Sequence, residues 1–230
     1  MKKIGIGIAA LLAGCCMPVE AIEGYNLVGV SANQMHFNVE EDGDETDSGS
    51  FLGFGVNYLH GFRLTGKLPL YLETGGSMKF MFYSDHQTTY SGVTPDGDWI
   101  RSGEYRQRIQ TVTLTVPVNV AYKWQINDKW ALVPYVGLDM KAHLSGWVTD
   151  ITIDENGEFR DVGNLFSNGE DDMDGRKWRR FQLGWNVGVR AEYRRVFASA
   201  SYGTDLTRVM DRDGAHIDTQ NIAVTFGYKF

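Results

Sequence analysis

The feature of this sequence that most restricts its fold is an alternation of apolar and polar residues that persists over unusually long segments. In residues 112–124 every second residue, from Val112 to Trp124, is apolar or aromatic, and the residues between them are small or polar. A period of two residues indicates a β-strand with two different faces. A strand of this length exceeds the five or six residues usual in soluble sheets. The segment therefore predicts a strand that turns one face to lipid and the other to a polar interior.

The same alternation recurs along the chain and predicts eight strands. Besides 112–124, it is clear in 70–82, 132–144, 181–193 and 221–230 and weaker in 25–37, 51–62 and 196–208. Long and short connections alternate, as outer loops and periplasmic turns do in membrane barrels. We expect long loops at 38–50, 84–108, 149–178 and 209–219, and short turns at 63–69, 125–129 and 194–195. The sequence thus predicts an all-β fold, an eight-stranded antiparallel up-and-down transmembrane β-barrel with both termini in the periplasm.

The first 21 residues have the composition of a secretory signal peptide. Two lysines precede an apolar stretch, residues 4–13, and Ala21 is a small residue at which a signal peptidase can cleave. This boundary predicts a mature barrel domain of residues 22–230. In the alternative interpretation, Cys15 belongs to a lipoprotein-type sequence and is lipidated. Because Cys15 and Cys16 are the only cysteines, cleavage after Ala21 would leave no disulfide or cysteine metal site.

Charge and hydropathy exclude two classes of protein. The formal net charge is -7 and the sequence pI is about 5.2, so no excess of basic residues is available to neutralise the phosphates of a nucleic acid. The mean hydropathy is -0.28, and no apolar run near twenty residues follows the N-terminal segment. A helical membrane protein is therefore excluded by hydropathy. A barrel is not, because only alternate residues of its strands face lipid.

Aromatic residues cluster where the predicted strands meet the short turns. Such positions correspond to the membrane interface, where barrels carry a belt of aromatic side chains. The predicted girdle consists of Phe62, Tyr122, Trp124, Trp130 and Tyr193.

The C-terminal segment resembles the closing strand of outer-membrane barrels. From Asn221 onward large apolar residues alternate with small or polar ones, and the segment 220–230 ends in Tyr228, Lys229 and Phe230. In that family the terminal strand ends in an aromatic residue and is read by the barrel-assembly machinery, so the resemblance implies an assembly signal at Tyr228 and Phe230. Segments 67–73, 134–138 and 183–188 are similar to OmpX-like or PorT-type barrels of Bacteroidetes. The resemblance implies a Gram-negative outer membrane and the lipid of that membrane as surroundings, but no particular activity.

Charged residues alternate into the predicted interior with both signs mixed. An eight-stranded barrel encloses a lumen that side chains can fill, and buried charges must be paired to be tolerated. The predicted interior charge network comprises Glu73, Lys79, Lys123, Asp139, Lys141, Arg190, Glu192, Asp205 and Lys229. A selective pore would more plausibly carry a ring of one sign. We therefore expect a filled barrel with a structural or surface-interaction role, and a narrow porin-like channel is an alternative.

An enzymatic role is the other alternative. His143 and Ser145 are predicted to share the inward face near the outer end of one strand, and some lipid-modifying barrels use such side chains. A histidine near a serine without an orienting acid is a weak signal. The remaining histidines are scattered, so the sequence predicts no catalytic site, no metal site and no cofactor. A soluble lipocalin-like carrier is a more distant possibility.

The outer loops provide the remaining functional surface. Residues 40–45 and 170–175 are rich in carboxylates that resemble calcium ligands, but neither run has the spacing of a calcium loop. A basic cluster, Arg176, Lys177, Arg179 and Arg180, could contact anionic lipid head groups. The loops are therefore expected to meet an unidentified surface partner.

Overall fold

The fold was obtained as a computed structural model that describes residues 24–41, 44–93, 99–154, 157–166, 178–209, 211–212 and 215–230. All regular elements in these residues are β-strands. The described part of the chain contains no helix of the length and hydropathy needed to cross a bilayer. The predicted signal peptide, the alternative lipidation site at Cys15 and the acidic run at 170–175 lie outside the described residues.

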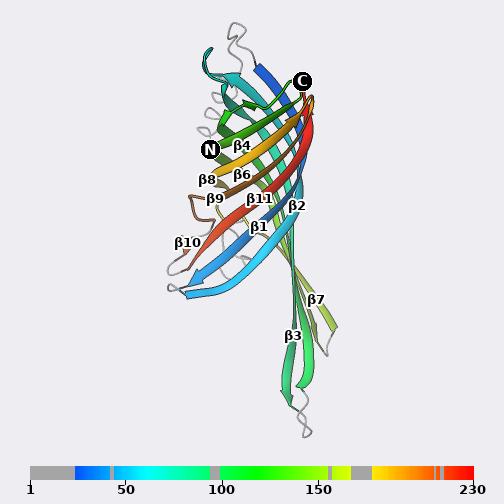
Figure 1. The fold of residues 1–230 in the computed structure, drawn as a ribbon. Coiled ribbons are helices and arrows are strands. Elements are labelled where there is room, and N and C mark those ends of the chain that lie inside the picture. The colour runs from blue at the N-terminus through cyan, green and yellow to red at the C-terminus, as the bar shows by residue number, and fades with distance from the viewer. Residues whose placement is uncertain are drawn as a thin grey trace.

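Eight long strands form a closed antiparallel ring (Figure 1). Three short strands pair at its edges: β5 (Trp124–Gln125), β7 (Gly157–Asn164) and β10 (Asp211–Arg212). In order around the ring the long strands are β1 (Gly24–Glu41), β2 (Asp44–Arg63), β3 (Leu70–Val93), β4 (Trp99–Tyr122), β6 (Trp130–Asp154), β8 (Phe181–Tyr193), β9 (Val196–Asp205) and β11 (Ala215–Lys229). This arrangement confirms the predicted eight-stranded antiparallel barrel.

The ring closes where the first strand pairs with the last. β1 and β11 are antiparallel over a register that runs from Leu27 opposite Lys229 to Glu41 opposite Ala215. At the end of the seam, Asn26 and Phe230 exchange two backbone hydrogen bonds of 2.9 and 3.0 Å. The aromatic C-terminus therefore completes the barrel's hydrogen-bond network.

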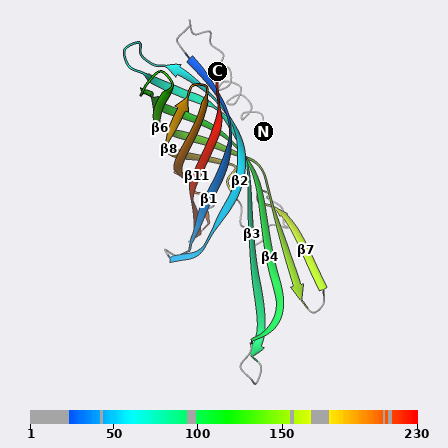
Figure 2. The same ribbon diagram turned by 45° about the vertical axis from the view of Figure 1, so that its right-hand side comes forward.

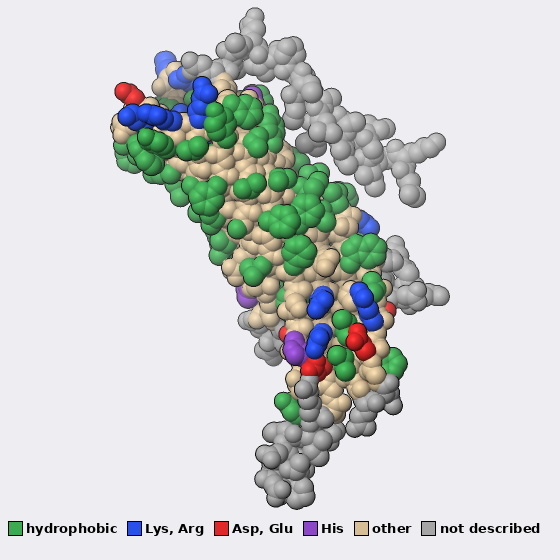
Figure 3. Space-filling model, turned by 90° about the vertical axis from the view of Figure 1, so that its right-hand side faces the viewer, with side chains coloured by type: hydrophobic (Ala, Val, Ile, Leu, Met, Phe, Trp, Pro, Cys, Tyr) green, Lys and Arg blue, Asp and Glu red, His purple; other side chains and the backbone are tan. Residues whose placement is uncertain are grey.

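The two faces of the barrel strands differ in exposure and polarity, as the alternation predicts. On β11, Ile222, Val224 and Phe226 are exposed, and on β8 Arg190 and Glu192 are almost completely buried in the lumen. Figure 3 shows hydrophobic side chains covering one side of the barrel, with charged side chains gathered at both ends of this band. We call these outward-facing apolar residues the apolar band. Such a surface suits lipid contact.

The prediction of long loops at 38–50 and 84–108 was wrong in large part. β1 and β2 extend through most of the first segment. β3 and β4 remain paired as far as Val93 opposite Trp99. In these segments both faces are polar, so the sequence lacks the contrast that reveals a strand. The aligned ladder nevertheless continues outward because each further pair satisfies two more backbone polar groups.

The extended hairpins form a sheet that projects beyond the barrel (Figures 1 and 2). It consists of the outer parts of β3, β4 and β6, from about residues 83–93, 99–110 and 147–154, together with β7. We call this sheet the blade. The predicted loop at 149–178 is therefore also partly strand, whereas the short turns at 63–69 and 194–195 lie between strands as expected.

The apolar band can be tested by placing a charge in it. Val187 lies at the middle of β8 with its side chain exposed. Val187→Arg is expected to lower the free energy of unfolding by about 2–4 kcal/mol, the cost of a cation near the bilayer midplane. The measurement is equilibrium unfolding in lipid vesicles. Thr152→Arg, at an exposed position of the blade, is the control and should change stability by less than about 0.5 kcal/mol. Equal effects of the two substitutions would contradict a lipid-facing band.

Candidate functional site: the lumen and the blade

The lumen is filled near the short turns by a buried ion network. Arg190 on β8 donates to both carboxylate oxygens of Glu73 on β3, at 2.5 and 3.2 Å, and to Glu192 at 3.1 Å. Lys229 donates a hydrogen bond of 2.6 Å to the same Glu192, and the Tyr25 hydroxyl donates a hydrogen bond to Glu73. Glu73 is 0% and Arg190 2% exposed. A bidentate guanidinium pair with these additional bonds compensates for removing the charges from water.

Lys123, between β4 and β5, joins the same network. Its ammonium lies 3.6 Å from Glu192. The structure thus brings together five of the nine predicted interior charges, Glu73, Lys123, Arg190, Glu192 and Lys229. Leu27 and Phe197 pack with Tyr25 as a small apolar cluster, and the Arg190 guanidinium lies 5.7 and 5.9 Å from the ring centres of Tyr25 and Phe197. Ions and apolar groups together fill this part of the lumen.

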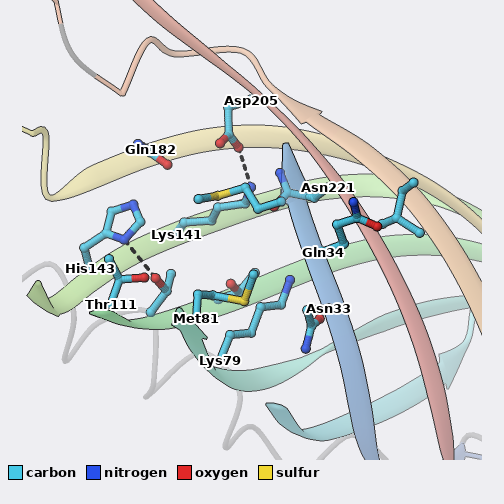
Figure 4. A pocket seen from close by; sticks show the side chains of 14 residues that line it. Asn33, Gln34, Lys79, Met81, Thr111, Lys141, His143, Gln182, Asp205 and Asn221 are labelled. Atoms are coloured by element: carbon cyan, nitrogen blue, oxygen red, sulfur yellow. Dashed lines mark hydrogen bonds and ion pairs between the residues drawn. The ribbon is translucent and has the colours of Figure 1, made fainter. Parts of the chain in front are cut away.

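The middle of the lumen holds a second, smaller group of charges (Figure 4). Lys141 on β6 forms an ion pair with Asp205, whose other oxygen accepts a hydrogen bond from Thr219. Asp139 accepts a hydrogen bond of 2.8 Å from Asn186. Lys79 lines both cavities of this layer, about 30 and 110 Å³ in volume, and contacts no acceptor among the described residues. The larger cavity is roomy enough for several waters.

Aromatic and aliphatic side chains close the outer end of the lumen. Phe51 packs against Phe37 and Tyr83, and its ring lies 6.1 Å from that of Trp178. Trp178 follows β7 in the chain and returns to the barrel mouth, where its backbone amide donates to the carbonyl of Leu165. The buried cluster consists of Phe37, Phe51, Met81, Ile109, Val148, Leu165, Phe166, Trp178, Val209 and Ile217. We call it the apolar plug.

The prediction that His143 and Ser145 share the inward face is wrong. The register of β4 and β6 shifts between Val112 and Thr113, so that His143 pairs with Thr113 while Ser145 pairs with Val112. Leu144 is the extra residue of this β-bulge. Beyond it Gly146 and Val148 face inward, and Ser145 no longer shares the face of His143.

His143 instead has structural partners. Its Nδ1 lies 2.8 Å from the Thr113 hydroxyl, and its ring stacks on Phe166 with a centroid distance of 5.6 Å. These contacts join the polar middle layer to the apolar plug. No cluster of metal-ligating side chains occurs in the part of the chain that the structure describes.

The predicted girdle residues lie at strand ends beside the short turns. Trp130 pairs with Tyr193, and their rings are 4.7 Å apart. Tyr122 and Trp124 are exposed, and Phe62 contacts His60 at a ring distance of 4.2 Å. At the C-terminus the rings of Tyr228 and Phe230 lie 6.4 Å apart on the outer surface.

Of the predicted basic cluster, only Arg179 and Arg180 lie within the described residues. The Arg180 guanidinium lies 4.9 Å from the ring centre of Phe166, at the edge of the apolar plug. Arg176 and Lys177 lie outside the described residues, and the side chains of 40–45 are likewise not described.

Sequence reasoning missed the apolar plug and the blade. One signal was present for the plug: on β1 the inward residues change from Ser31 and Asn33 to Met35 and Phe37 as the strand leaves the middle layer. An apolar inward face at the outer end of a strand predicts a closed mouth. Trp178 could not be assigned because it reaches the mouth from an irregular segment.

Comparison with known proteins gives a family match and distant structural similarities. A family model described as outer membrane protein beta-barrel domain matches residues 6–230. Among solved structures, Ail, the attachment invasion locus protein of Yersinia pestis, is 15% identical with a TM-score of 0.36, covering 90% of this chain and 99% of that chain. The outer membrane protease OmpT from Escherichia coli is 11% identical with a TM-score of 0.35, covering 94% and 99%. Neisserial surface protein A is 12% identical with a TM-score of 0.34, covering 88% and 97%. No curated protein sequence gives a significant match.

The ion network can be tested at its central residue. Arg190→Met removes the shared partner of Glu73 and Glu192, so two buried carboxylates lose a compensating charge. We expect a loss of about 3–5 kcal/mol in the free energy of unfolding. Replacing Glu73 by Gln in the same variant should recover part of this loss, because one uncompensated charge is removed.

The matched control is Arg195→Met in the exposed turn between β8 and β9, where the guanidinium donates to the Tyr228 hydroxyl at 3.2 Å and to no other side chain that the structure describes. Its effect should stay below about 0.5 kcal/mol. Unfolding curves in detergent measure all three variants. An Arg190→Met protein as stable as the parent would rule out a stabilising network.

Proposed function

The chain belongs to the outer membrane protein β-barrel domain family, and from this premise we propose that it is a surface-interaction protein with neither enzymatic nor channel activity. In this proposal outer-membrane lipid surrounds the barrel, and both termini lie in the periplasm. The blade and the remaining outer segments face the cell exterior. The barrel-assembly machinery reads Tyr228 and Phe230 during biogenesis.

The observation that carries this proposal is the blade. β3 pairs with β2 only as far as Phe82, and β7 pairs with β6 alone among the described strands. The blade therefore has two edges with unpaired backbone groups, and such edges can accept a strand from another protein. Phe159 and Val162 on β7 are more than half exposed. A second polypeptide that adds a strand along β7 would cover both the edge and these side chains.

The contents of the lumen favour a scaffold over a channel. The apolar plug lies at the outer end and the Arg190 network at the other, with the two small cavities of the middle layer between them. Separation of His143 from Ser145 also removes the arrangement that had favoured a lipid-modifying enzyme.

Conductance tests the scaffold role directly. The purified protein in planar bilayers should show no steady, large single-channel current, because ions would have to cross both the apolar plug and the ion network. Phe51→Ala together with Trp178→Ala should raise the frequency of brief openings, since it removes two of the largest rings of the plug. Stable conductance of the parent protein would exclude a closed lumen.

Surface labelling tests the exposure of the blade. The predicted mature chain has no cysteine, so single cysteines can be introduced without background. Gln87→Cys in the blade should react with a membrane-impermeant maleimide on intact cells, whereas Lys67→Cys in a short turn should react only after the envelope is opened. The reverse pattern would contradict the proposed orientation.

The same position pair tests the interaction itself. A photo-crosslinking amino acid at Phe159 should give adducts with a second polypeptide on intact cells, and the same group at Lys67 should not. Absence of any polypeptide adduct at Phe159 and at Val162 would refute the β7 edge as a protein-binding surface.

A further inference from the structure

We propose that the outward face at the foot of the blade binds the phosphate groups of membrane lipid through Arg108 and Arg160. This inference rests on the proposed function in one respect, namely that the blade lies on the outer side of the membrane. The lipid is then that of the outer leaflet.

The register places successive rows of side chains on the outward face. The last row of the apolar band contains Leu52, Phe82 and Trp147, all strongly exposed. Two residues further out, the next row on this face reads Ser84, Arg108, Thr149 and Val162 across β3, β4, β6 and β7. The row beyond it reads His86, Arg106, Ile151 and Arg160, and the third contains Glu104 and Glu158. Basic residues thus separate the apolar band from the acidic row.

These rows match the order of chemical layers in a bilayer. A step of two residues is about 7 Å along a strand, and a tilt near 45° reduces this to about 5 Å along the membrane normal. Arg108 therefore lies about 5 Å beyond the last apolar row and Arg160 about 10 Å beyond it. The head-group region is about 5–8 Å thick on each side, and flexible arginine side chains extend several ångströms back toward it.

Arg108 and Arg160 are available for a ligand. Both side chains are exposed, and neither has a hydrogen bond or ion pair with any residue that the structure describes. Arg106 differs, because its guanidinium contacts Glu104 at 2.6 Å, and His86 lies 3.5 Å from the same carboxylate. Glu104 is therefore already occupied by a cation on its own face. The two remaining guanidiniums lack an internal anion.

The neighbouring side chains favour a lipid over a soluble anion. Trp147 and Val162 are about half exposed on the same face, and Ile151 lies between Arg106 and Arg160 in their row. Tryptophan beside arginine is typical of a membrane interface, where one group meets acyl chains and the other meets phosphate. Figure 3 shows charged side chains directly beyond the hydrophobic surface of the barrel. An amphipathic ligand satisfies both kinds of side chain at once.

The guanidinium group also favours phosphate as the partner. Its planar donors form bidentate hydrogen bonds with phosphate oxygens. The chain as a whole has a net charge of -7, so clustering of unpaired arginines on this face runs against the overall composition. Arg108 on β4 and Arg160 on β7 lie two strand spacings, or about 10 Å, apart across the sheet and one row, or about 7 Å, apart along it. Such a spacing allows separate phosphate groups to be held by the two strands.

The experiment compares phosphorylated and dephosphorylated lipid. Purified full-chain protein in detergent is titrated with bisphosphorylated lipid A, and the bound fraction is measured by native mass spectrometry. We expect R108Q/R160Q to bind about tenfold more weakly, since two exposed charge-assisted contacts of roughly 0.7 kcal/mol each are lost. Lipid A without phosphates should bind the parent protein as weakly as the variant binds the phosphorylated lipid.

Two controls test whether weaker binding reflects only the lower positive charge of the variant or a failure to fold. K67Q/K129Q removes the same charge from exposed short turns at the other end of the barrel and should bind phosphorylated lipid A like the parent. Far-ultraviolet circular dichroism verifies that both double variants are folded. Equal binding by R108Q/R160Q and the parent, or displacement of the lipid by inorganic phosphate alone, would overturn the proposal. If Gln87→Cys labels from outside while this binding is absent, only the lipid inference fails and the proposed function stands.

Discussion

The structure depends on one constraint: in hydrocarbon, every backbone amide and carbonyl must find a partner within the protein. An open sheet leaves two unpaired edges, and each unpaired group would cost several kcal/mol in lipid. Pairing of β1 with β11 removes those edges over the whole height of the barrel. Outside the bilayer water can satisfy an edge, which is why β7 and the outer part of β3 can each have a side without a partner strand among the described strands. The closed barrel and the open blade are two consequences of the same rule.

Closure of only eight strands in turn determines the lumen. The interior is narrow, so most inward side chains pack or pair with another, and the others line the two cavities of the middle layer. Arg190 meets this requirement by contacting Glu192, two residues along the same strand, and Glu73 on the distant strand β3. Phe51 meets it by packing with rings from β1, β3 and an irregular segment. The polar middle layer is possible because both of these layers shield it.

The sequence predicts the barrel well because lipid and lumen impose opposite chemistry on alternate residues. Residues 112–124 and 181–193 display that contrast and coincide closely with β4's inner part and β8. The contrast disappears at 84–108, where polar residues occupy both faces, and the strands there could not be recognised from the alternation. Trp178 was missed for another reason, since its packing depends on a loop path that no periodicity encodes.

The one extra residue at the Leu144 β-bulge determines which residues of the outer half of β6 face the lumen. Before it, odd-numbered residues of β6 such as Lys141 and His143 face the lumen. β3 and β4 have no such shift at this level, so an unbulged β6 would point Trp147 inward, away from the row of Phe82. The extra residue reverses the phase and aligns Trp147 with the apolar band. The same residue that separates Ser145 from His143 therefore makes the outward face of the blade continuous with the apolar band of the barrel.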